Sequence, residues 1–164
     1  MKSIFHRTSI RKYKDLPVEE EKIEKMLQAA MAAPSARNQQ PWQFYVVRNK
    51  DVIHALASCS PYVKFAYDAP LVFVPCYKED LPSKDYANID MSACVENLLL
   101  EADYLGLGCT WCGISPNKER MDNVRNVLNI PSHLHAFAIV PCGYPAEEKI
   151  QQDRYDRERI IFVD

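Results

Sequence analysis

Residues 33–44 read Ala-Pro-Ser-Ala-Arg-Asn-Gln-Gln-Pro-Trp-Gln-Phe, a polar stretch punctuated by two prolines. Apolar residues at helical spacing precede it and an apolar run follows it, so we predict a loop that joins a helix to a strand. Loops of this kind carry binding residues more often than the elements that they join. The stretch is also compatible with an ordinary turn, and the rest of the chain decides between the two interpretations.

A second polar stretch, Arg7-Thr-Ser-Ile-Arg11, lies close to the N-terminus. Its two guanidinium groups can form paired hydrogen bonds with phosphate oxygens, and its two hydroxyl groups can add further ones. Arginines near a terminus are also often simply solvated. On the phosphate hypothesis, the binding residues are Arg7, Thr8, Ser9 and Arg11.

The pattern of apolar residues predicts helices and strands that mix without strict alternation, which indicates an α+β fold. Helices are expected from Pro17-Val-Glu-Glu-Glu to just before Pro34, at about 51–57, at about 86–105 and from Ser115-Pro116 onward. Strands are expected at 44–47, 71–74 and 136–140.

Three of these helices have distinctive features. Pro17 fits the first turn of its helix, where the acids that follow complement the helix dipole. Ser115 can cap the last helix, with Pro116 in its first position. The helix at 86–105 has an apolar stripe so wide that it should be central and heavily buried.

Composition limits the class of protein. The chain has 164 residues, of which 48% are hydrophobic and 26% charged, as expected for a single globular domain over 1–164. A net charge of −2 gives no electrostatic reason to expect nucleic acid or a membrane surface as a partner. The first residues are too polar for a secretion signal, so we expect a cytoplasmic location.

Six cysteines include the pair Cys109 and Cys112 in a C-x-x-C spacing. A redox dithiol and a zinc site completed by His133 and His135 are both compatible with this spacing. However, the pair follows a helix end rather than a helix start, where a thiol pKa would be lowered. We therefore interpret the cysteines as small buried hydrophobic residues and predict no metal site.

Glycine is scarce, with only four residues, and neither the G-x-G-x-x-G nor the G-x-x-x-x-G-K-[ST] motif is present. The chain therefore lacks the glycine-rich turns with which Rossmann and P-loop proteins approach phosphates. Motifs for nucleophilic or acid–base catalysis are also lacking, so we predict no catalytic side chain. The chain thus has a predicted binding loop and a predicted phosphate-binding segment but no catalytic side chains, which indicates that a bound cofactor carries out the chemistry.

Both polar stretches resemble motifs of the nitroreductase family. Arg7-Thr-Ser-Ile-Arg11 is similar to the family's Arg-Arg-Ser-x-Arg, and residues 33–44 are similar to Ala-Pro-Ser-x-x-Asn-x-Gln-Pro-Trp-x-Phe. The resemblance implies the short form of this fold, with a mixed central sheet flanked by helices. It also implies a homodimer with the long central helix at its interface, and bound flavin mononucleotide (FMN).

The resemblance assigns FMN-binding roles to residues in four segments. Loop 33–44 would contribute to the flavin held chiefly by the other subunit, the segment after the central helix would place backbone against the ring, and a late arginine would reach the phosphate. The implied residues are Arg7, Thr8, Ser9, Arg11, Pro34, Ser35, Ala36, Asn38, Trp111, Cys112, Gly113 and Arg154.

Two details of this assignment depart from the family pattern or stay open. Thr8 replaces the second arginine of the family motif, which either weakens the binding of the phosphate or gives Arg154 a larger share of it. Arg157 and Arg159 are the alternatives to Arg154. A backbone N–H of Cys112 or Gly113 near flavin N5 would stabilise the reduced ring.

The implied activity is that of an oxidoreductase with ping-pong kinetics. NAD(P)H would reduce bound FMN and leave, and a small acceptor such as a nitroaromatic or a quinone would then take the electrons. The alternative is a flavin-binding store or sensor without significant turnover. The sequence leaves open which acceptor is used and whether NADH or NADPH is preferred.

Overall fold

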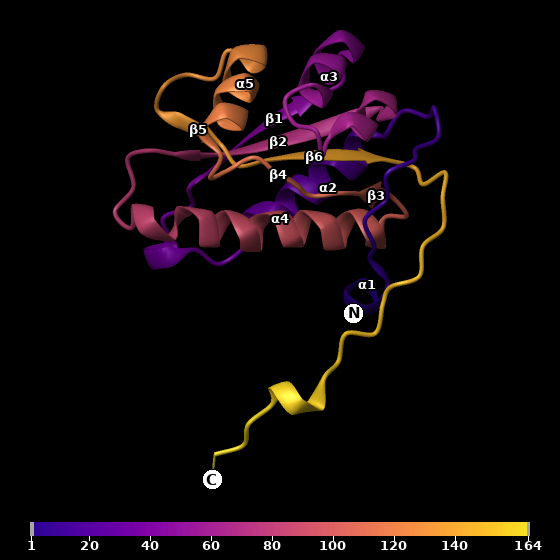
Figure 1. The fold of residues 1–164 in the computed structure, drawn as a ribbon, viewed down its shortest axis with the longest axis vertical. Coiled ribbons are helices and arrows are strands. Elements are labelled where there is room, and N and C mark those ends of the chain that lie inside the picture. Colours follow the sequence, from indigo (N-terminus) through magenta and orange to yellow (C-terminus); the bar gives the residue numbers. More distant parts are fainter. Residues whose placement is uncertain (1, 164) are drawn as a thin grey trace.

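A computed structural model describes residues 2–163 as three layers, with a sheet between two groups of helices (Figure 1). Within these residues, six strands form the sheet: β1 Trp42–Val47, β2 Leu71–Lys78, β3 Gly108–Cys109, β4 Cys112–Gly113, β5 Leu134–Ala136 and β6 Ala138–Gly143. Every ladder between these strands is antiparallel. The α+β class is confirmed, and the mixed character expected of the sheet is limited to an isolated parallel bridge between Ser9 and Cys109.

Strand β2 lies between β1 on one side and the β5–β6 run on the other. Cys76 faces Ala136 but Phe73 faces Val140, so the pairing shifts by one residue between β5 and β6. Phe137 is the extra residue, a β-bulge, and its N–H donates to the carbonyl oxygen of Pro75 at 2.9 Å. The bulge falls opposite Pro75, which has no N–H for the ladder.

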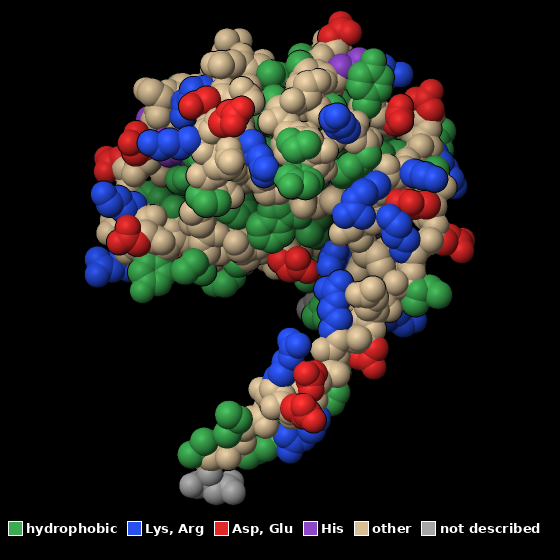
Figure 2. Space-filling model, viewed as in Figure 1, with side chains coloured by type: hydrophobic (Ala, Val, Ile, Leu, Met, Phe, Trp, Pro, Cys, Tyr) green, Lys and Arg blue, Asp and Glu red, His purple; other side chains and the backbone are tan. Residues whose placement is uncertain are grey.

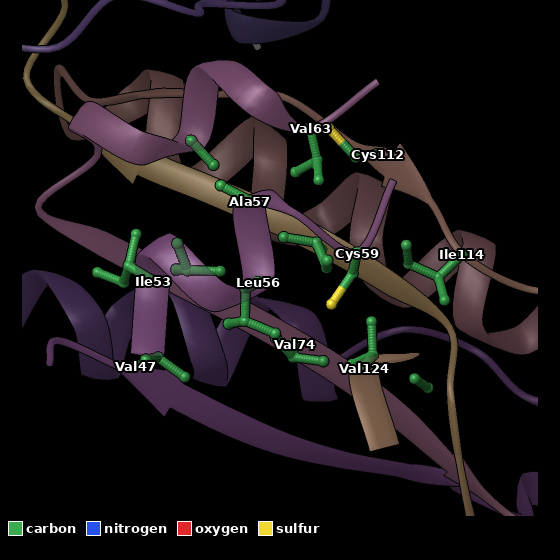
Figure 3. Packing of buried hydrophobic residues seen from close by; sticks show 14 of the residues in the cluster. Val47, Ile53, Leu56, Ala57, Cys59, Val63, Val74, Cys112, Ile114 and Val124 are labelled. Atoms are coloured by element: carbon green, nitrogen blue, oxygen red, sulfur yellow. The ribbon is translucent and has the colours of Figure 1, made fainter. Parts of the chain in front are cut away.

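The sheet is covered on both faces, because successive residues of β2 enter different cores. Val72 and Val74 belong to the core under α3 (Lys50–Ala57) and α5 (Lys118–Leu128). Figure 3 shows part of this core, with Val74 facing Leu56 and Val124.

Leu71 and Phe73 belong to the opposite core, which also contains residues of α2 (Glu20–Met31) and α4 (Ala87–Tyr104). Helix α4 buries residues over about half of its circumference, among them Met91, Cys94, Leu98 and Ala102. The prediction of a central, heavily buried helix is therefore confirmed. Within residues 2–163, none of the helices combines the length and the apolar character that a membrane crossing requires.

Two helix starts differ from the predictions. Helix α2 begins at Glu20, because Glu19 is extended and serves as its N-cap residue, so Pro17 lies outside the helix. Helix α5 begins at Lys118 and is capped by Asn117, whose side chain accepts a hydrogen bond from a backbone N–H one turn on. The Ser115 hydroxyl, expected to be the cap, instead lies 3.1 Å from an amide oxygen on α4.

The chain ends lie apart from the three layers. The short helix α1 (Ser3–His6) contacts α4, and residues beyond 151 form a tail that runs away from the body (Figure 1). Short 3₁₀ turns complete the structure: η1 Ala36–Asn38, η2 Lys64–Asp68, η3 Lys84–Tyr86 and η4 Arg157–Arg159.

Candidate functional site

The segment Arg7–Arg11 lies against β3, at the edge of the sheet. The Ile10 N–H donates to the carbonyl oxygen of Cys109 at 3.1 Å, and the Thr110 hydroxyl donates to the carbonyl oxygen of Ile10 at 2.7 Å. Gly108 permits this close approach, since a Cβ on it would lie 2.6 Å from the Cβ of Ile10. The sequence gives no sign of this contact, which joins residues about one hundred positions apart.

The structure places the two guanidinium groups of this segment at different points. The Arg7 Nε lies 3.4 Å from a carboxylate oxygen of Glu96 on α4. The Arg11 guanidinium lies 5.6 Å from the ring centre of Phe65 in η2, which packs on the opposite face of the sheet. Four extended residues span about 13 Å. Because their partners lie on opposite faces of the sheet, the two side chains suit different parts of an elongated ligand better than a single phosphate.

Basic side chains gather where the tail leaves the body (Figure 2). A cavity of about 1060 Å³ in this region is lined by Arg7, Thr8, Lys14 and Lys149, together with three acidic side chains. Glu147 is one of these acids, and its carboxylate lies 2.9 Å from the ammonium group of Lys149, which lowers the pKa of Glu147. Glu147 therefore already has a cationic partner, and Arg7 and Lys14 are the other two cations among the lining residues.

Loop 33–44 is fixed to the start of α4. The Ala36 N–H and the Gln39 amide donate to the two carboxylate oxygens of Asp90 at 2.9 and 2.7 Å. Pro34 and Asn38 are exposed, and Ser35 and Ala36 are half-buried. Pro34 and Asn38 are therefore the predicted binding residues of this loop that a ligand or a second molecule can reach most readily.

The loop and Arg7 occupy different sides of the same helix. Their contact residues on α4, Asp90 and Glu96, are six residues apart, which corresponds to about 9 Å along the axis and about 120° around it. One chain therefore does not bring the two polar stretches to a single point.

Residues 110–113 continue the edge of the sheet beside β6. The Thr110 N–H donates to a β6 carbonyl at 3.3 Å, and the Ile114 N–H donates to the carbonyl of Phe137 at 3.1 Å. Because alternate residues of an antiparallel strand face the partner, Cys112 also faces β6, whereas the N–H groups of Trp111 and Gly113 point away from it. Gly113 is exposed, and nothing lies within 4 Å of the position of an added Cβ.

The two cysteines of the C-x-x-C pair are buried thiols. Burial raises the pKa of Cys112 to about 11 and also raises the pKa of Cys109, so both are protonated near neutral pH. Such thiols are poor nucleophiles and poor metal ligands. In the part of the chain that the structure describes, no three His, Cys, Asp or Glu side chains are grouped to hold a metal ion. His135 instead packs against the ring of Tyr77.

The tail arginines differ in their partners. Arg157 donates to the carbonyl oxygen of Ile160 at 3.2 Å, and Arg159 donates to the carboxylate of Asp156 at 2.9 Å. Within residues 2–163, Arg154 makes neither a side-chain hydrogen bond nor an ion pair, and it is exposed. It is the tail arginine whose guanidinium is available to a ligand.

Sequence reasoning missed Asp90, the anchor of loop 33–44. The signal was present, because Asp90 is an acid within the apolar stripe of the helix at 86–105. Spacing alone did not reveal its partners, which lie about 50 residues earlier in the chain.

Comparisons with known proteins show the family to which this fold and sequence belong. The model of the nitroreductase family matches residues 4–60 and 56–144. A relative from Methanothermobacter thermautotrophicus, provisionally named NADH dehydrogenase/NAD(P)H nitroreductase, is 39% identical over 98% of this chain and 84% of its own. The structure of an FMN-dependent nitroreductase from Clostridium difficile matches with a TM-score of 0.91 at 32% identity, over 99% of this chain and 98% of that one. A provisional nitroreductase from Desulfovibrio desulfuricans, solved in complex with FMN, has a TM-score of 0.82 at 28% identity, over 99% and 95%.

Proposed function

Because the chain belongs to the nitroreductase family, we propose that it is an FMN-dependent oxidoreductase that passes electrons from NAD(P)H to a small acceptor such as a nitroaromatic or a quinone. The observation that carries the proposal is that the backbone N–H groups of Trp111 and Gly113 point away from β6 and are free to bind a ligand. They follow Cys109 along the same sheet edge, and Cys109 pairs with Ser9, so they lie beside the segment Arg7–Arg11. The names of the two FMN-linked relatives support the choice of cofactor.

The residues present suit the two ends of FMN. A phosphate with close to two negative charges fits the part of the cavity next to Arg7 and Lys14, where Thr8 adds a hydroxyl group and Ser9 follows in the chain. Arg154 is the further cation available from the tail. Arg11, which lies apart from Arg7, is then free to face the flavin ring.

FMN, when bound, supplies the two-electron chemistry that the side chains lack. The exposed N–H of Gly113 can donate a hydrogen bond to the ring, and the charge of Arg11 can stabilise negative charge that develops on it. Of the two backbone donors considered, Gly113 is the better candidate, because Cys112 faces β6. Ping-pong kinetics follow if donor and acceptor use the same face of the site in turn.

We further propose a homodimer in which each FMN is held by two chains. Helix α4 leaves apolar side chains uncovered, with Ile89 63% and Tyr104 77% exposed. The tip of the tail is also apolar and projects from the body (Figure 2), with Ile161 84% and Phe162 70% exposed. A second copy would cover both surfaces, and it would supply the loop that one chain cannot bring to Arg7.

The first test is the visible spectrum of the purified protein after addition of FMN. We expect tight, noncovalent binding, and Arg11→Ala should weaken it by about 1.5–3 kcal/mol, the value of a hydrogen bond to a charged group. Anaerobic NAD(P)H should bleach the flavin, and a nitroaromatic should restore its colour. Protein that ignores added FMN would refute the proposal, whereas bound flavin that NAD(P)H fails to reduce would favour a store or sensor.

The second test addresses the shared site. Sedimentation should give a dimer, and mixing Arg11→Ala chains with Asn38→Ala chains should form heterodimers with one intact site and one doubly defective site. Purified heterodimers should then bind about half as much FMN as wild-type dimers, whereas an unsorted 1:1 mixture should reach only about a quarter. A monomer that retains FMN, or verified heterodimers without recovery, would contradict a shared site.

A further inference from the structure

Loop 33–44 contains an unusual run of backbone conformations. Arg37, Asn38 and Gln40 have φ values of 52°, 54° and 46°, in the left-handed region. Residues with a Cβ rarely adopt this region because the side chain approaches the backbone, and three instances within four positions require support from the surroundings. Such clusters are typical of sites where a backbone must present a group in one orientation.

The support comes from Asp90 and Gln39. Asp90 is 4% exposed, and its two carboxylate oxygens accept hydrogen bonds from the Ala36 N–H at 2.9 Å and the Gln39 amide at 2.7 Å. The Gln39 side chain also bonds the backbone of Ser83 in both directions, donating at 3.1 Å and accepting at 3.0 Å. The loop is therefore tied on both sides of Arg37 and Asn38 to the segment that begins α4.

A role in folding alone does not account for this arrangement. Asp90 lies in the apolar stripe of α4, where burying a carboxylate costs free energy that an apolar side chain would not. The two hydrogen bonds offset that cost only while the loop keeps its conformation. The Asp90 carboxylate thus stabilises the loop, although an apolar side chain at this position would stabilise the packing of α4 more.

We infer that Asp90 is a positioning residue, which acts through Gln39 to hold Arg37, Asn38 and Gln40 in the left-handed conformation that presents Asn38 to FMN. The inference rests on the proposed function for the identity of the ligand. The clamp itself can be observed without FMN, so the two ideas can fail separately.

The test begins with Asp90→Asn, which keeps the shape of the side chain. Both partners donate hydrogen bonds, so the new amide nitrogen meets a donor and one bond is lost. In FMN-free protein we expect the Ala36 amide to exchange hydrogen at least about tenfold faster, and FMN affinity to fall at least about tenfold, the effect of losing one hydrogen bond to a charged group. Asp122→Asn on the exposed side of α5 is the matched control and should change neither.

A glycine rescue separates positioning from folding. Adding Arg37→Gly and Gln40→Gly to Asp90→Asn removes the side chains that disfavour positive φ, while Asn38 stays in place. FMN affinity should return to within about threefold of a reference that carries the two glycines alone, because glycine accepts this conformation readily. A defect in the packing of α4 would not respond to glycines in the loop.

Should Asp90→Asn fail to fold, Gln39→Met tests the same clamp from the loop side and should speed exchange and weaken FMN binding in the same direction. Unchanged exchange at Ala36 in the folded variants, or FMN affinity that no glycine restores, would overturn the inference. Wild-type protein that binds no FMN would refute the proposed function, while the exchange comparison would still decide whether Asp90 holds the loop.

Discussion

Replacing Gly108 with alanine should displace the N-terminal segment from the sheet. The added Cβ would lie 2.6 Å from both Cβ and Cγ1 of Ile10 and 2.8 Å from its Cγ2. Carbon atoms in contact sit about 3.5–4.0 Å apart, so the segment must move by about 1 Å. The Cβ of Ile10 is close to its own backbone, and a change of rotamer cannot relieve the contact.

The size of the effect follows from two contributions. Overpacking of a tight contact costs about 1–3 kcal/mol. Weakening the hydrogen bond from the Ile10 N–H to the Cys109 carbonyl oxygen adds about 1 kcal/mol. For a chain of this length, 1 kcal/mol lowers the melting temperature by roughly 2–4 °C, so a total of about 2–4 kcal/mol should lower it by about 4–16 °C.

Thermal unfolding of FMN-free protein, at one fixed protein concentration, measures this decrease. Gly113→Ala is the matched control, because nothing lies within 4 Å of its added Cβ, and it should unfold within about 1–2 °C of wild type. Gly108→Ala should also weaken FMN binding, since it moves Arg7 and Ser9. A variant as stable as the control, with unchanged FMN affinity, would refute the close packing of Ile10 on Gly108.

Other predictions concern buried groups and the tail. Burial raises the pKa of Cys94 to about 12, so at high pH the folded state keeps a proton that the unfolded state releases. The free energy of unfolding should therefore fall above about pH 9 by up to roughly 1.4 kcal/mol per pH unit for this thiol, and urea titrations of Cys94→Ala should show a shallower decline. Tyr13→Phe removes a buried hydroxyl that lies 2.7 and 3.2 Å from two backbone carbonyls, and calorimetry should show a loss of about 1–2 kcal/mol; an unchanged value would mean that these bonds contribute nothing net. Arg154→Ala should weaken FMN binding about tenfold and Arg157→Ala less than about threefold in a flavin titration, and the reverse order would reassign the phosphate contact.

Much of the fold could be predicted because its signals are local. The wide stripe at 86–105 became α4, and the β-branched run at 71–74 became the centre of β2, since periodicity and burial act over a few neighbouring residues. The helix starts at Pro17 and Ser115 were wrong, because the residue that caps a helix depends on which backbone is extended at that point. Motif and composition likewise indicated the family and a cofactor-based chemistry.

The candidate site could be predicted only as a set of residues, without their arrangement. Spacing did not show that Arg7 and Arg11 contact elements packed on opposite faces of the sheet. Nor did it show that, in the pairing with β6, the N–H of Cys112 faces β6 and the N–H of Gly113 points away. Both facts depend on strand register, which is set by pairing across long stretches of chain.

The sequence by itself determined the approximate positions of the longer helices and strands, the family that the chain resembles and the polar stretches that are available for binding. Only the tertiary structure decided that Asp90 holds loop 36–40, that Ile10 packs on Gly108, and that one chain does not assemble both polar stretches at one point. The physical reason is the separation along the chain over which each kind of interaction acts. Helix and turn preferences arise between residues a few positions apart, whereas each of these contacts joins residues 50 to 100 positions apart, whose distance is defined only once the sheet and its helices have packed.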